Sequence, residues 1–315
     1  MNDWFHNCLS VEKTPAGWVP CRFTPRQLDY YQSLSVWAGI RSRCCTGITM
    51  DFTTDARELS FSFQTGDFCR NWLAFDLFEE DRLLYSAVYP EGVPSGRVVF
   101  RRDHGGRARF SLHLPYQCQI TLNDFSFGDA SPILPSRKGV LWCIGDSITQ
   151  GMEAVHPSQT YAALLGETLQ MNVFNQAVGG IGFKDLCLDF SGVPKADAVL
   201  VALGTNDCPC ALEDWEQYAG RVKESIRLIR DAADAAPVTL ISPFWRGDLE
   251  ERGFQDTLPR IRALLEEEAG RAGFHFIDGL KVLPHDPSFC GDGRLHPNDL
   301  GFSICARVLA GQIGI

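Results

Sequence analysis

The stretch "LWCIGDSITQG", residues 141–151, marks the point at which one sequence pattern gives way to another. Its apolar run ends in Gly145 and Asp146, and Ser147 follows directly. A serine just after a strand often does no more than cap the next helix. The same place, at the end of a buried strand, also suits the nucleophile of an enzyme. The residues in the rest of the chain distinguish between these two interpretations.

Apolar strands and amphipathic helices alternate after this stretch. The expected strands are "GVLWCIG" (139–145), "MNVFNQAV" (171–178), "ADAVLVALG" (196–204), "PVTLISP" (237–243) and "GFHFIDG" (273–279). Helical segments separate the later strands, and a last helix is expected after "HPND" (296–299). Continuous apolar strands that alternate with helices predict a parallel sheet with helices on both faces. Ligands of such sheets bind beyond the carboxyl ends of the strands.

The first 128 residues show a different pattern. Short runs of aromatic and β-branched residues are separated by turn sequences such as "EGVPSG" (91–96) and "DHGG" (103–106), and no segment sustains a helical period. This pattern predicts an antiparallel, jelly-roll-like β-sandwich over residues 1–128. A linker is expected over 129–138, and the α/β domain over 139–315. The arginine-rich segment 97–110 is expected to form the solvated face of a β-hairpin.

Composition narrows the classes of function. The chain has 315 residues, which favours two domains, and a formal net charge of −10, which argues against nucleic acid and anionic membranes as partners. No run reaches the ~18 apolar residues of a membrane helix, and the N-terminus lacks a signal-peptide pattern. The twelve cysteines are scattered without zinc-site spacing, so we expect reduced thiols in the cytosol and no metal site.

Polar residues follow each predicted strand of the second half. They include Ser147, the glycines of "AVGGIGF" (177–183), Asn206 in "GTND" (204–207) and the histidine of "CGDGRLHPND" (290–299). A serine, a histidine near an acid, N–H groups at glycine turns and an asparagine amide are the components of an acyl-transfer site. The ends of parallel strands meet at one edge of the sheet, so these residues are expected to come together.

Four motifs extend this expectation to a known family. "GDSITQG" (145–151), "NQAVGG" (175–180), "GTND" (204–207) and "DGRLHPND" (292–299) occur in the order of the conserved blocks of the GDSL/SGNH hydrolase family, and the chain resembles that family. Its members are esterases, thioesterases, lipases and carbohydrate deacetylases with a flavodoxin-like three-layer α/β/α fold. A preceding β-sandwich is similar to that of carbohydrate-directed acyl esterases and related acyltransferases. For residues 1–128 the resemblance is architectural only.

The resemblance implies a role for each motif residue. Ser147 matches the nucleophile, and its backbone N–H matches one donor of the oxyanion hole. Gly180 matches the second donor through its N–H, and Asn206 the third through its side-chain amide. His296 matches the general base. These roles agree with the chemistry, because a serine hydroxyl needs a base to remove its proton and the developing oxyanion needs fixed donors.

The acid of the triad departs from the family pattern. The family places it three positions before the histidine, and in this sequence that position is Gly293. Asp292 lies one position earlier and reaches His296 if the loop bulges by one residue, so Asp292 is the predicted acid. Two alternatives stay open: Asp286 substitutes for it, or a backbone carbonyl holds His296 and the enzyme uses a Ser–His dyad.

Four further residues are candidates for the substrate pocket. His156 lies shortly after the nucleophile motif. Phe244 and Trp245 follow the fourth strand and are expected to form an apolar or sugar-stacking wall, with core packing as the alternative. Asp146 flanks Ser147, and either lines the pocket or fixes its loop by hydrogen bonds to backbone N–H groups, as Asp207 and Asn175 are also expected to do.

The sequence therefore predicts a cytosolic serine esterase that needs neither cofactor nor metal. Its expected substrate is a short acyl ester, such as an acetyl ester, of a small carbohydrate or metabolite. An acyltransferase of the same fold and a lipase or thioesterase for longer acyl chains are alternatives with the same chemistry. A non-catalytic carbohydrate-binding protein is the alternative from a different class. The acyl group, the alcohol and a possible homo-oligomer are not determined by the sequence.

Overall fold

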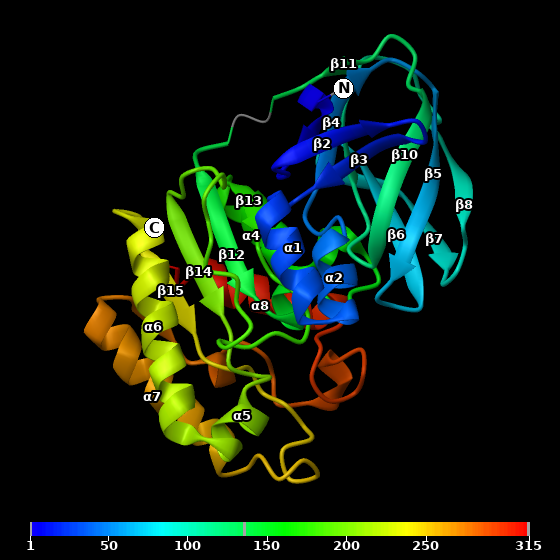
Figure 1. The fold of residues 1–315 in the computed structure, drawn as a ribbon. Coiled ribbons are helices and arrows are strands. Elements are labelled where there is room, and N and C mark those ends of the chain that lie inside the picture. The colour runs from blue at the N-terminus through cyan, green and yellow to red at the C-terminus, as the bar shows by residue number, and fades with distance from the viewer. Residues whose placement is uncertain (1, 135–136, 314–315) are drawn as a thin grey trace. The chain divides into compact units, whose positions relative to one another are not determined.

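A computed structural model describes residues 2–134 and 137–313 (Figure 1). The chain divides into two compact units, one of Met1–Arg137 with His156–Ser158 and the other of Lys138–Val155 with Gln159–Ile315. The first unit is built from antiparallel sheets and the second from a parallel sheet with helices, as the change of sequence pattern predicts.

The sandwich unit contains two antiparallel sheets. The first has the order β1 (Phe5–His6), β4 (Thr49–Thr54), β9 (Ala108–His113), β6 (Trp72–Glu79) and β7 (Arg82–Pro90), and β11 (Ser131–Pro132) also pairs with β4. The second has the order β2 (Ser10–Thr14), β3 (Gly17–Cys21), β10 (Cys118–Ser126), β5 (Glu58–Phe68) and β8 (Ser95–Arg101). Because β11 lies inside residues 129–138, part of the expected linker belongs to the sandwich.

The strand pairs of the sandwich are nested along the chain. Strand β6 pairs with β7, β5 with β8, β4 with β9 and β3 with β10, all antiparallel. The chain thus forms one long two-stranded ribbon whose tip lies between β6 and β7, and the ribbon is rolled into two sheets. This arrangement is a jelly roll, which confirms the predicted fold of the first half.

A large aromatic core fills the sandwich. Phe52, Phe61, Phe75 and Phe110 are fully buried, and Phe52 stacks on Phe110 with ring centroids 5.6 Å apart. The strands alternate as half-buried strands do: in β8 the side chains at 98 and 100 are buried, whereas those at 97, 99 and 101 are exposed. Burial of this apolar surface is the main stabilising contribution to the unit.

Two predictions for the first half are wrong. Helices α1 (Pro25–Leu34) and α2 (Val36–Arg43) occur where no helix was expected. Their start was readable in the sequence, since Thr24 and Gln27 form a capping box and Pro25 occupies the first helical position. The arginine-rich segment 97–110 is not a hairpin either, because β8 and β9 belong to different sheets.

The second unit is a five-stranded parallel sheet. Its order is β13 (Asn172–Asn175), β12 (Val140–Gly145), β14 (Ala198–Ala202), β15 (Val238–Ile241) and β16 (His275–Ile277). This is the flavodoxin-like order 2-1-3-4-5, as predicted for this half. The chain reverses its direction of travel across the sheet between β12 and β14. That switch point is where ligands of such sheets bind, beyond the carboxyl ends of the strands.

Helices cover both faces of this sheet. They are α3 (Ser147–Gln150), α4 (Tyr161–Leu169), α5 (Cys208–Glu213), α6 (Trp215–Ala233), α7 (Thr257–Ala272) and α8 (Asp299–Ala310). Figure 1 shows α6 and α7 together on one face and α4 and α8 on the other. Strands β14 and β15 are buried along their whole length, which explains their continuous apolar sequences. The short helices α3 and α5 were not predicted.

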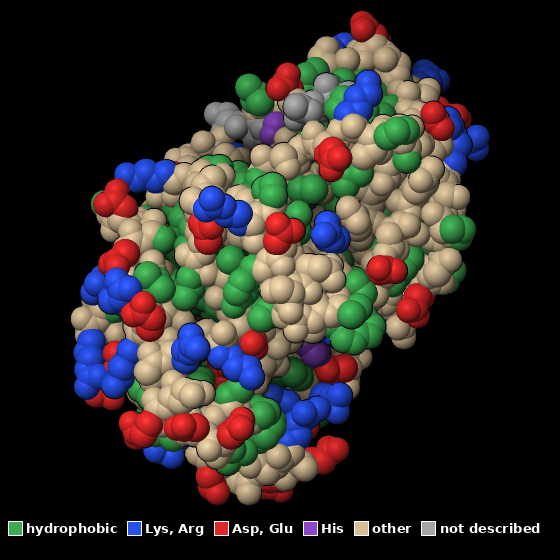
Figure 2. Space-filling model, viewed as in Figure 1, with side chains coloured by type: hydrophobic (Ala, Val, Ile, Leu, Met, Phe, Trp, Pro, Cys, Tyr) green, Lys and Arg blue, Asp and Glu red, His purple; other side chains and the backbone are tan. Residues whose placement is uncertain are grey.

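Four short 3₁₀ helices complete the described elements: η1 (Asn2–Trp4), η2 (Pro157–Gln159), η3 (Gly279–Lys281) and η4 (Pro287–Phe289). Within residues 2–134 and 137–313, no helix has the length and apolar character required to cross a membrane. Acidic and basic side chains are interspersed on the face of the molecule that Figure 2 shows.

Candidate active site

A chain of hydrogen bonds joins three residues beyond the carboxyl end of β12. The Oγ atom of Ser147 lies 2.8 Å from Nε2 of His296, and Nδ1 of the same imidazole lies 2.8 Å from Oδ2 of Asp292. Ser147 lies two positions after the end of β12, at the start of α3, whereas the other two residues lie on the loop that precedes α8. The structure therefore brings together residues that are separated by about half of the chain.

Ser147 is not the cap of the helix that it begins. The side chain of Asp146 caps α3 by accepting a hydrogen bond from the N–H of Ile148 at 2.9 Å, and Ser147 is the first helical residue. Its hydroxyl is therefore available to His296, and its own N–H is one of the amide groups that lack an intrahelical acceptor. The capping interpretation of this serine, which the local sequence allowed, is excluded.

Asp292 lies behind the imidazole although it is four positions before His296. Its Oδ1 atom accepts hydrogen bonds from the N–H groups of Arg294, Leu295 and His296 at 3.0, 2.9 and 3.1 Å. Gly293 has a φ of +72°, a left-handed conformation that glycine adopts without steric cost. This turn of the backbone accommodates the one additional residue between Asp292 and His296. The prediction that Asp292 contacts His296 is confirmed, and its catalytic role stays a prediction.

The environment of Asp292 keeps its carboxylate ionised. Burial raises the pKa of this group, but the hydrogen bonds from the His296 side chain and from the N–H groups of Leu295 and Arg294 outweigh burial and hold the pKa well below its ordinary value. An ionised carboxylate only accepts hydrogen bonds, so Nδ1 of His296 must donate to it. In a neutral imidazole with this tautomer, Nε2 is the nitrogen without a proton, and it is the atom that faces the hydroxyl of Ser147.

The two alternatives to this acid do not match the structure. Asp286 is exposed, and its Oδ1 accepts a hydrogen bond from the N–H of Ser288 at 2.8 Å, where it caps η4. The hydrogen bond between Nδ1 of His296 and Asp292 also takes the place that a backbone carbonyl would have in a Ser–His dyad.

The loop that bears His296 is closed on itself. The N–H of Gly291 donates to the carbonyl of His296 at 2.8 Å, and Cys290 and Pro297 form an antiparallel bridge. Directly after the loop, the side chain of Asn298 caps α8 by accepting a hydrogen bond from the N–H of Gly301. The base is thus held between a closed loop and the start of a helix, which limits its movement.

Two of the three predicted oxyanion donors lie in the loops that follow β13 and β14. Gly180 has a φ of +85°, and its N–H donates no hydrogen bond to the residues that the structure describes. The Nδ2 atom of Asn206 donates to the carbonyl of Ile181 at 3.0 Å, which brings the amide to the turn that contains Gly180. An amide nitrogen has two hydrogens, so this bond orients the second one. The turn itself is held by Gln150, whose Oε1 accepts from the N–H of Gly179 at 2.7 Å.

Two buried aspartates flank the motif residues and hold their loops. Asp207 accepts hydrogen bonds from the N–H of Phe183 at 3.2 and 3.3 Å, and a Cβ atom at Gly182 would lie only 1.7 Å from its Oδ1. Burial raises the pKa of Asp207 to about 7 and that of Asp146 to about 6. The loop-fixing role expected of both residues agrees with these bonds.

Asn175 fixes its loop in the same way. Its Nδ2 donates to the carbonyl of Thr149 at 2.8 Å, and its Oδ1 accepts from the N–H of Ala177 at 3.1 Å. The expected role of Asn175 in loop geometry is therefore confirmed.

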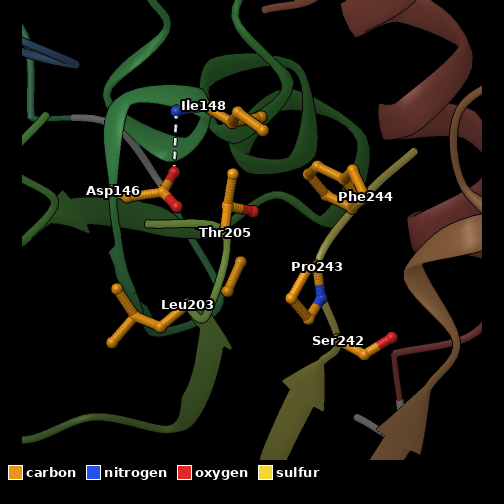
Figure 3. A pocket seen from close by; sticks show the side chains of 8 residues that line it. Asp146, Ile148, Leu203, Thr205, Ser242, Pro243 and Phe244 are labelled. Atoms are coloured by element: carbon orange, nitrogen blue, oxygen red, sulfur yellow. Dashed lines mark hydrogen bonds between the residues drawn. The ribbon is translucent and has the colours of Figure 1, made fainter. Parts of the chain in front are cut away.

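The four pocket candidates have different places. Asp146 and Phe244 are almost fully buried and line a cavity of about 10 Å³ together with Thr205 (Figure 3), which is room for roughly one water and not for an acyl group. Trp245 is half-buried and stacks on His285, with ring centroids 5.9 Å apart and planes at 15°. His156 belongs to the sandwich unit, where its Nδ1 lies 3.0 Å from the buried carboxylate of Asp76.

Sequence reasoning missed three residues that hold the site loops. Gln150 lies in "GDSITQG" but was assigned no role, and Arg246 and Asp248 lie in "WRGD" (245–248), which resembles an exposed charged turn. Arg246 and Asp248 are both less than 6% exposed. This burial could not be predicted from the sequence, because opposite charges two positions apart are common on protein surfaces. The place of "WRGD" directly after a predicted strand end was the available signal.

Neither the charged nor the thiol groups suggest a metal centre. Among the residues that the structure describes, no three His, Cys, Asp or Glu side chains are grouped as metal ligands would be. The twelve cysteines are free thiols, and nine of them are buried.

Comparison with known proteins identifies one family and several similar folds. Residues 143–304, just over half of the chain, match the model of the GDSL-like lipase/acylhydrolase family. No curated protein matches the sequence. Three similar solved structures are a salicylyl-acyltransferase from a tetracycline biosynthetic pathway, a family two carbohydrate esterase from Clostridium thermocellum in complex with cellohexaose, and an acetyl xylan esterase from the rumen bacterium Butyrivibrio proteoclasticus.

These three structures share the fold at low sequence identity. The acyltransferase has a TM-score of 0.80 and 17% identity, and the match covers 98% of this chain and 93% of that one. The Clostridium esterase has a TM-score of 0.63 and 18% identity, with coverages of 84% and 90%. The Butyrivibrio esterase has a TM-score of 0.60 and 16% identity, with coverages of 84% and 88%. The likeness establishes the shared fold, which is a sandwich followed by an α/β domain.

Proposed function

Because the chain belongs to the GDSL-like lipase/acylhydrolase family, we propose that it is a serine esterase that removes short acyl groups, such as acetyl, from a small acylated carbohydrate or metabolite. The observation that supports this proposal most directly is the continuous hydrogen-bond chain from Ser147 through His296 to Asp292. This chain is the arrangement that activates a serine hydroxyl for attack on a carbonyl carbon.

The first half of the reaction forms an acyl-enzyme. Oγ of Ser147 attacks the ester carbonyl carbon while Nε2 of His296 takes the hydroxyl proton. The imidazolium that forms is stabilised by the carboxylate of Asp292, which accepts the Nδ1 proton in a hydrogen bond without removing it. When the tetrahedral intermediate collapses, His296 returns the proton to the departing alcohol oxygen, and the acyl group stays on Ser147.

The second half releases the acid. A water molecule gives a proton to His296 and attacks the acyl carbon, and the proton then passes to Oγ of Ser147 as the carboxylic acid leaves. In both halves the negative carbonyl oxygen lies within reach of three donors: the N–H of Ser147, the N–H of Gly180 and the side-chain amide of Asn206. Each such donor contributes typically ~10²–10³ in rate, because it is oriented before the charge develops.

Architecture and one aromatic residue support a carbohydrate ester as the substrate. The fold that combines a sandwich with this α/β domain also occurs in the family two carbohydrate esterase and in the acetyl xylan esterase. In this chain the half-buried indole of Trp245 offers a flat apolar surface on the segment after β15.

The twelve free thiols support the cytosol as the compartment.

Acyl transfer to another alcohol is a second candidate function. The fold likeness to the salicylyl-acyltransferase, which extends over nearly the whole chain, favours it. The chemistry is identical up to the acyl-enzyme, and only the nucleophile of the second half differs, since an alcohol replaces water. A non-catalytic binding protein is less well supported, because Ser147, Gly180, Asn206 and His296 are all present and His296 is in hydrogen-bonding contact with Ser147.

A series of p-nitrophenyl esters from acetate to laurate tests the proposed specificity. We expect kcat/KM to be highest for acetate and to fall as the acyl chain lengthens, and peracetylated xylo-oligosaccharides to be deacetylated. A maximum at long acyl chains would contradict the esterase proposal in favour of a lipase or thioesterase. The same reactions with added glycerol or sugar distinguish the second candidate, because transfer yields a new ester in place of free acetate.

A further inference from the structure

The segment from Arg246 to Asp248, which follows β15, contacts two loops of the site. Nη1 of Arg246 donates a hydrogen bond to the carbonyl of Thr205 at 3.1 Å, directly before Asn206. The N–H of Gly247 donates to the carbonyl of Arg294 at 2.7 Å, two positions before His296. A single short segment therefore touches the loop of the oxyanion donor and the loop of the base.

Arg246 is held in one position by a buried ion pair. Its Nε and Nη2 atoms bind the two carboxylate oxygens of Asp248 at 2.6 and 3.0 Å, and both side chains are at most 4% exposed. Arg252 also donates to Asp248, at 2.7 Å, and the guanidinium of Arg246 lies over the ring of Phe254. A bidentate pair with these additional contacts leaves Nη1 fixed and aimed at Thr205.

Because a peptide unit is planar, a hydrogen bond that fixes its carbonyl also restricts the residue that follows. The carbonyl of Thr205 and the N–H of Asn206 belong to one planar unit, so fixing the oxygen fixes the start of Asn206. On the other loop, the carbonyl of Arg294 and the N–H of Leu295 form a second planar unit. Gly247 holds its oxygen, and Asp292 accepts its N–H. Both planar units are thus fixed by groups that are themselves buried or hydrogen-bonded.

We propose that Arg246 is a positioning residue for catalysis: through Thr205 its side chain holds the Asn206 amide in place, while the adjacent N–H of Gly247 holds the loop of His296. This inference rests on the proposed esterase function and adds a residue that does not touch the substrate. A donor that moves by about 1 Å loses most of its effect on the transition state, with rate losses on the order of 10²-fold.

A purely structural role for the ion pair makes a different prediction. If Arg246 only stabilises the fold, its substitution lowers stability, and any loss of activity is independent of Asn206. If Arg246 acts through Asn206, the two substitutions are strongly non-additive, because the amide that Arg246 positions has already been removed.

A double-mutant cycle with Arg246→Met and Asn206→Ala separates these roles. The readouts are kcat and KM for p-nitrophenyl acetate and the second-order rate of labelling of Ser147 by a fluorophosphonate. We expect Arg246→Met to lower kcat by about 10–100-fold with KM changed by less than about 3-fold, since oxyanion donors act in the transition state. In the Asn206→Ala background the same substitution should cost less than about 3-fold.

Arg102 in the sandwich provides a matched control. It is also a buried arginine that forms an ion pair with a carboxylate, that of Glu79, and donates to two backbone carbonyls, at Ala56 and Gly106. We expect Arg102→Met to lower the urea midpoint of unfolding but to leave kcat within about 2-fold, with the same small effect in the Asn206→Ala background.

Arg246→Lys is the second variant, in case the methionine variant does not fold. Lysine keeps a positive charge beside Asp248 but lacks the planar fork that also reaches Thr205, so we expect the same loss of kcat in a folded protein. Equal fold-losses from Arg246 substitution in the presence and absence of the Asn206 amide would overturn the inference alone. A folded wild-type protein that neither hydrolyses the ester nor labels at Ser147 overturns the proposed function, and the inference with it.

Discussion

At the scale of single residues, the acid of the triad shows how a departure from a sequence pattern is accommodated. Asp292 is one position further from His296 than the family pattern places it, and yet it makes the expected hydrogen bond at 2.8 Å. The left-handed Gly293 takes up the additional residue, and three N–H groups bind the other carboxylate oxygen. The loop geometry, not the spacing, therefore supports Asp292 as the acid.

We predict that Asp292→Asn lowers kcat by about 10²–10⁴-fold while the protein remains folded. An asparagine side chain also carries hydrogen-bond donors, so it no longer requires Nδ1 of His296 to be protonated, and Nε2 loses its role as base. Steady-state kinetics with p-nitrophenyl acetate measure this effect. Asp286→Asn is the control, and its kcat should stay within about 2-fold. Activity of Asp292→Asn within a few-fold of wild type would show that Asp292 is not the acid.

The sequence was sufficient for some residues of the site and not for others. Ser147 and His296 were identified from motifs, because short motifs specify the chemical groups directly. The burial of Arg246 and its ion pair with Asp248 depend on three-dimensional contacts that the motifs do not encode. For the same reason the sequence favoured Asp292 as the acid but left Asp286 and a dyad open as alternatives.

At the scale of elements, one buried carboxylate connects the loops that follow β13 and β14 by hydrogen bonds. Asp207 follows β14, and it accepts the N–H of Phe183 in the turn that follows β13. Next to it, Asn206 donates to Ile181 of the same turn. These two adjacent residues thus connect the loops that contain two of the predicted oxyanion donors.

The raised pKa of Asp207 predicts a specific pH dependence of stability. In the folded protein burial raises the pKa to about 7, from an ordinary value of 3.8. Between these two values the folded state binds a proton that the unfolded state has released, so the free energy of unfolding falls as the pH rises and reaches its lower level above pH 7. Asp207→Asn removes this contribution.

As the pH rises from 5 to 8, we therefore expect the free energy of unfolding of wild type to fall relative to that of Asp207→Asn by about 3 kcal/mol, which is about 1.4 kcal/mol for each pH unit up to the pKa. Urea unfolding of both proteins at a series of pH values measures this difference. Other titrating groups act in both proteins and cancel to a first approximation. Two stability curves that run parallel across this range would contradict the proposed burial of a proton at Asp207.

Element prediction succeeded where the period of the sequence is strong. All five parallel strands were predicted, and the signal was strongest for β14 and β15, which are buried along their whole length because both faces of the sheet are covered. Helices α1 and α2 were missed because they interrupt a region of strands and are only 10 and 8 residues long. The segment 97–110 was misjudged because in a jelly roll consecutive strands often belong to different sheets, and no local signal distinguishes this from a hairpin.

At the scale of the whole molecule, the α/β unit places its chemistry at the switch point of the sheet. Ser147 follows the first strand in sequence, Gly180 the second and Asn206 the third, and β12 is paired with both β13 and β14. The order 2-1-3-4-5 thus makes neighbours of three loops that lie far apart in the chain. The base then needs only one further loop, the one before α8.

The sandwich illustrates the limit of reading a function from a sequence. Residues 1–128 have no motif of the family, and the strand pattern predicted their architecture but assigned them no function. Three-dimensional likeness extends to this unit at identities below 20%, where it shows the fold alone.

The central claim is that the hydrogen-bond chain activates Ser147 as a nucleophile, and covalent labelling tests it most directly. Folded protein is incubated with a fluorophosphonate, and the adduct is counted by intact mass and located by peptide mapping. We expect one adduct per chain, on Ser147, absent in Ser147→Ala and formed at least about 10³-fold more slowly in His296→Ala. An unlabelled folded protein, or an adduct on another residue, would contradict the claim.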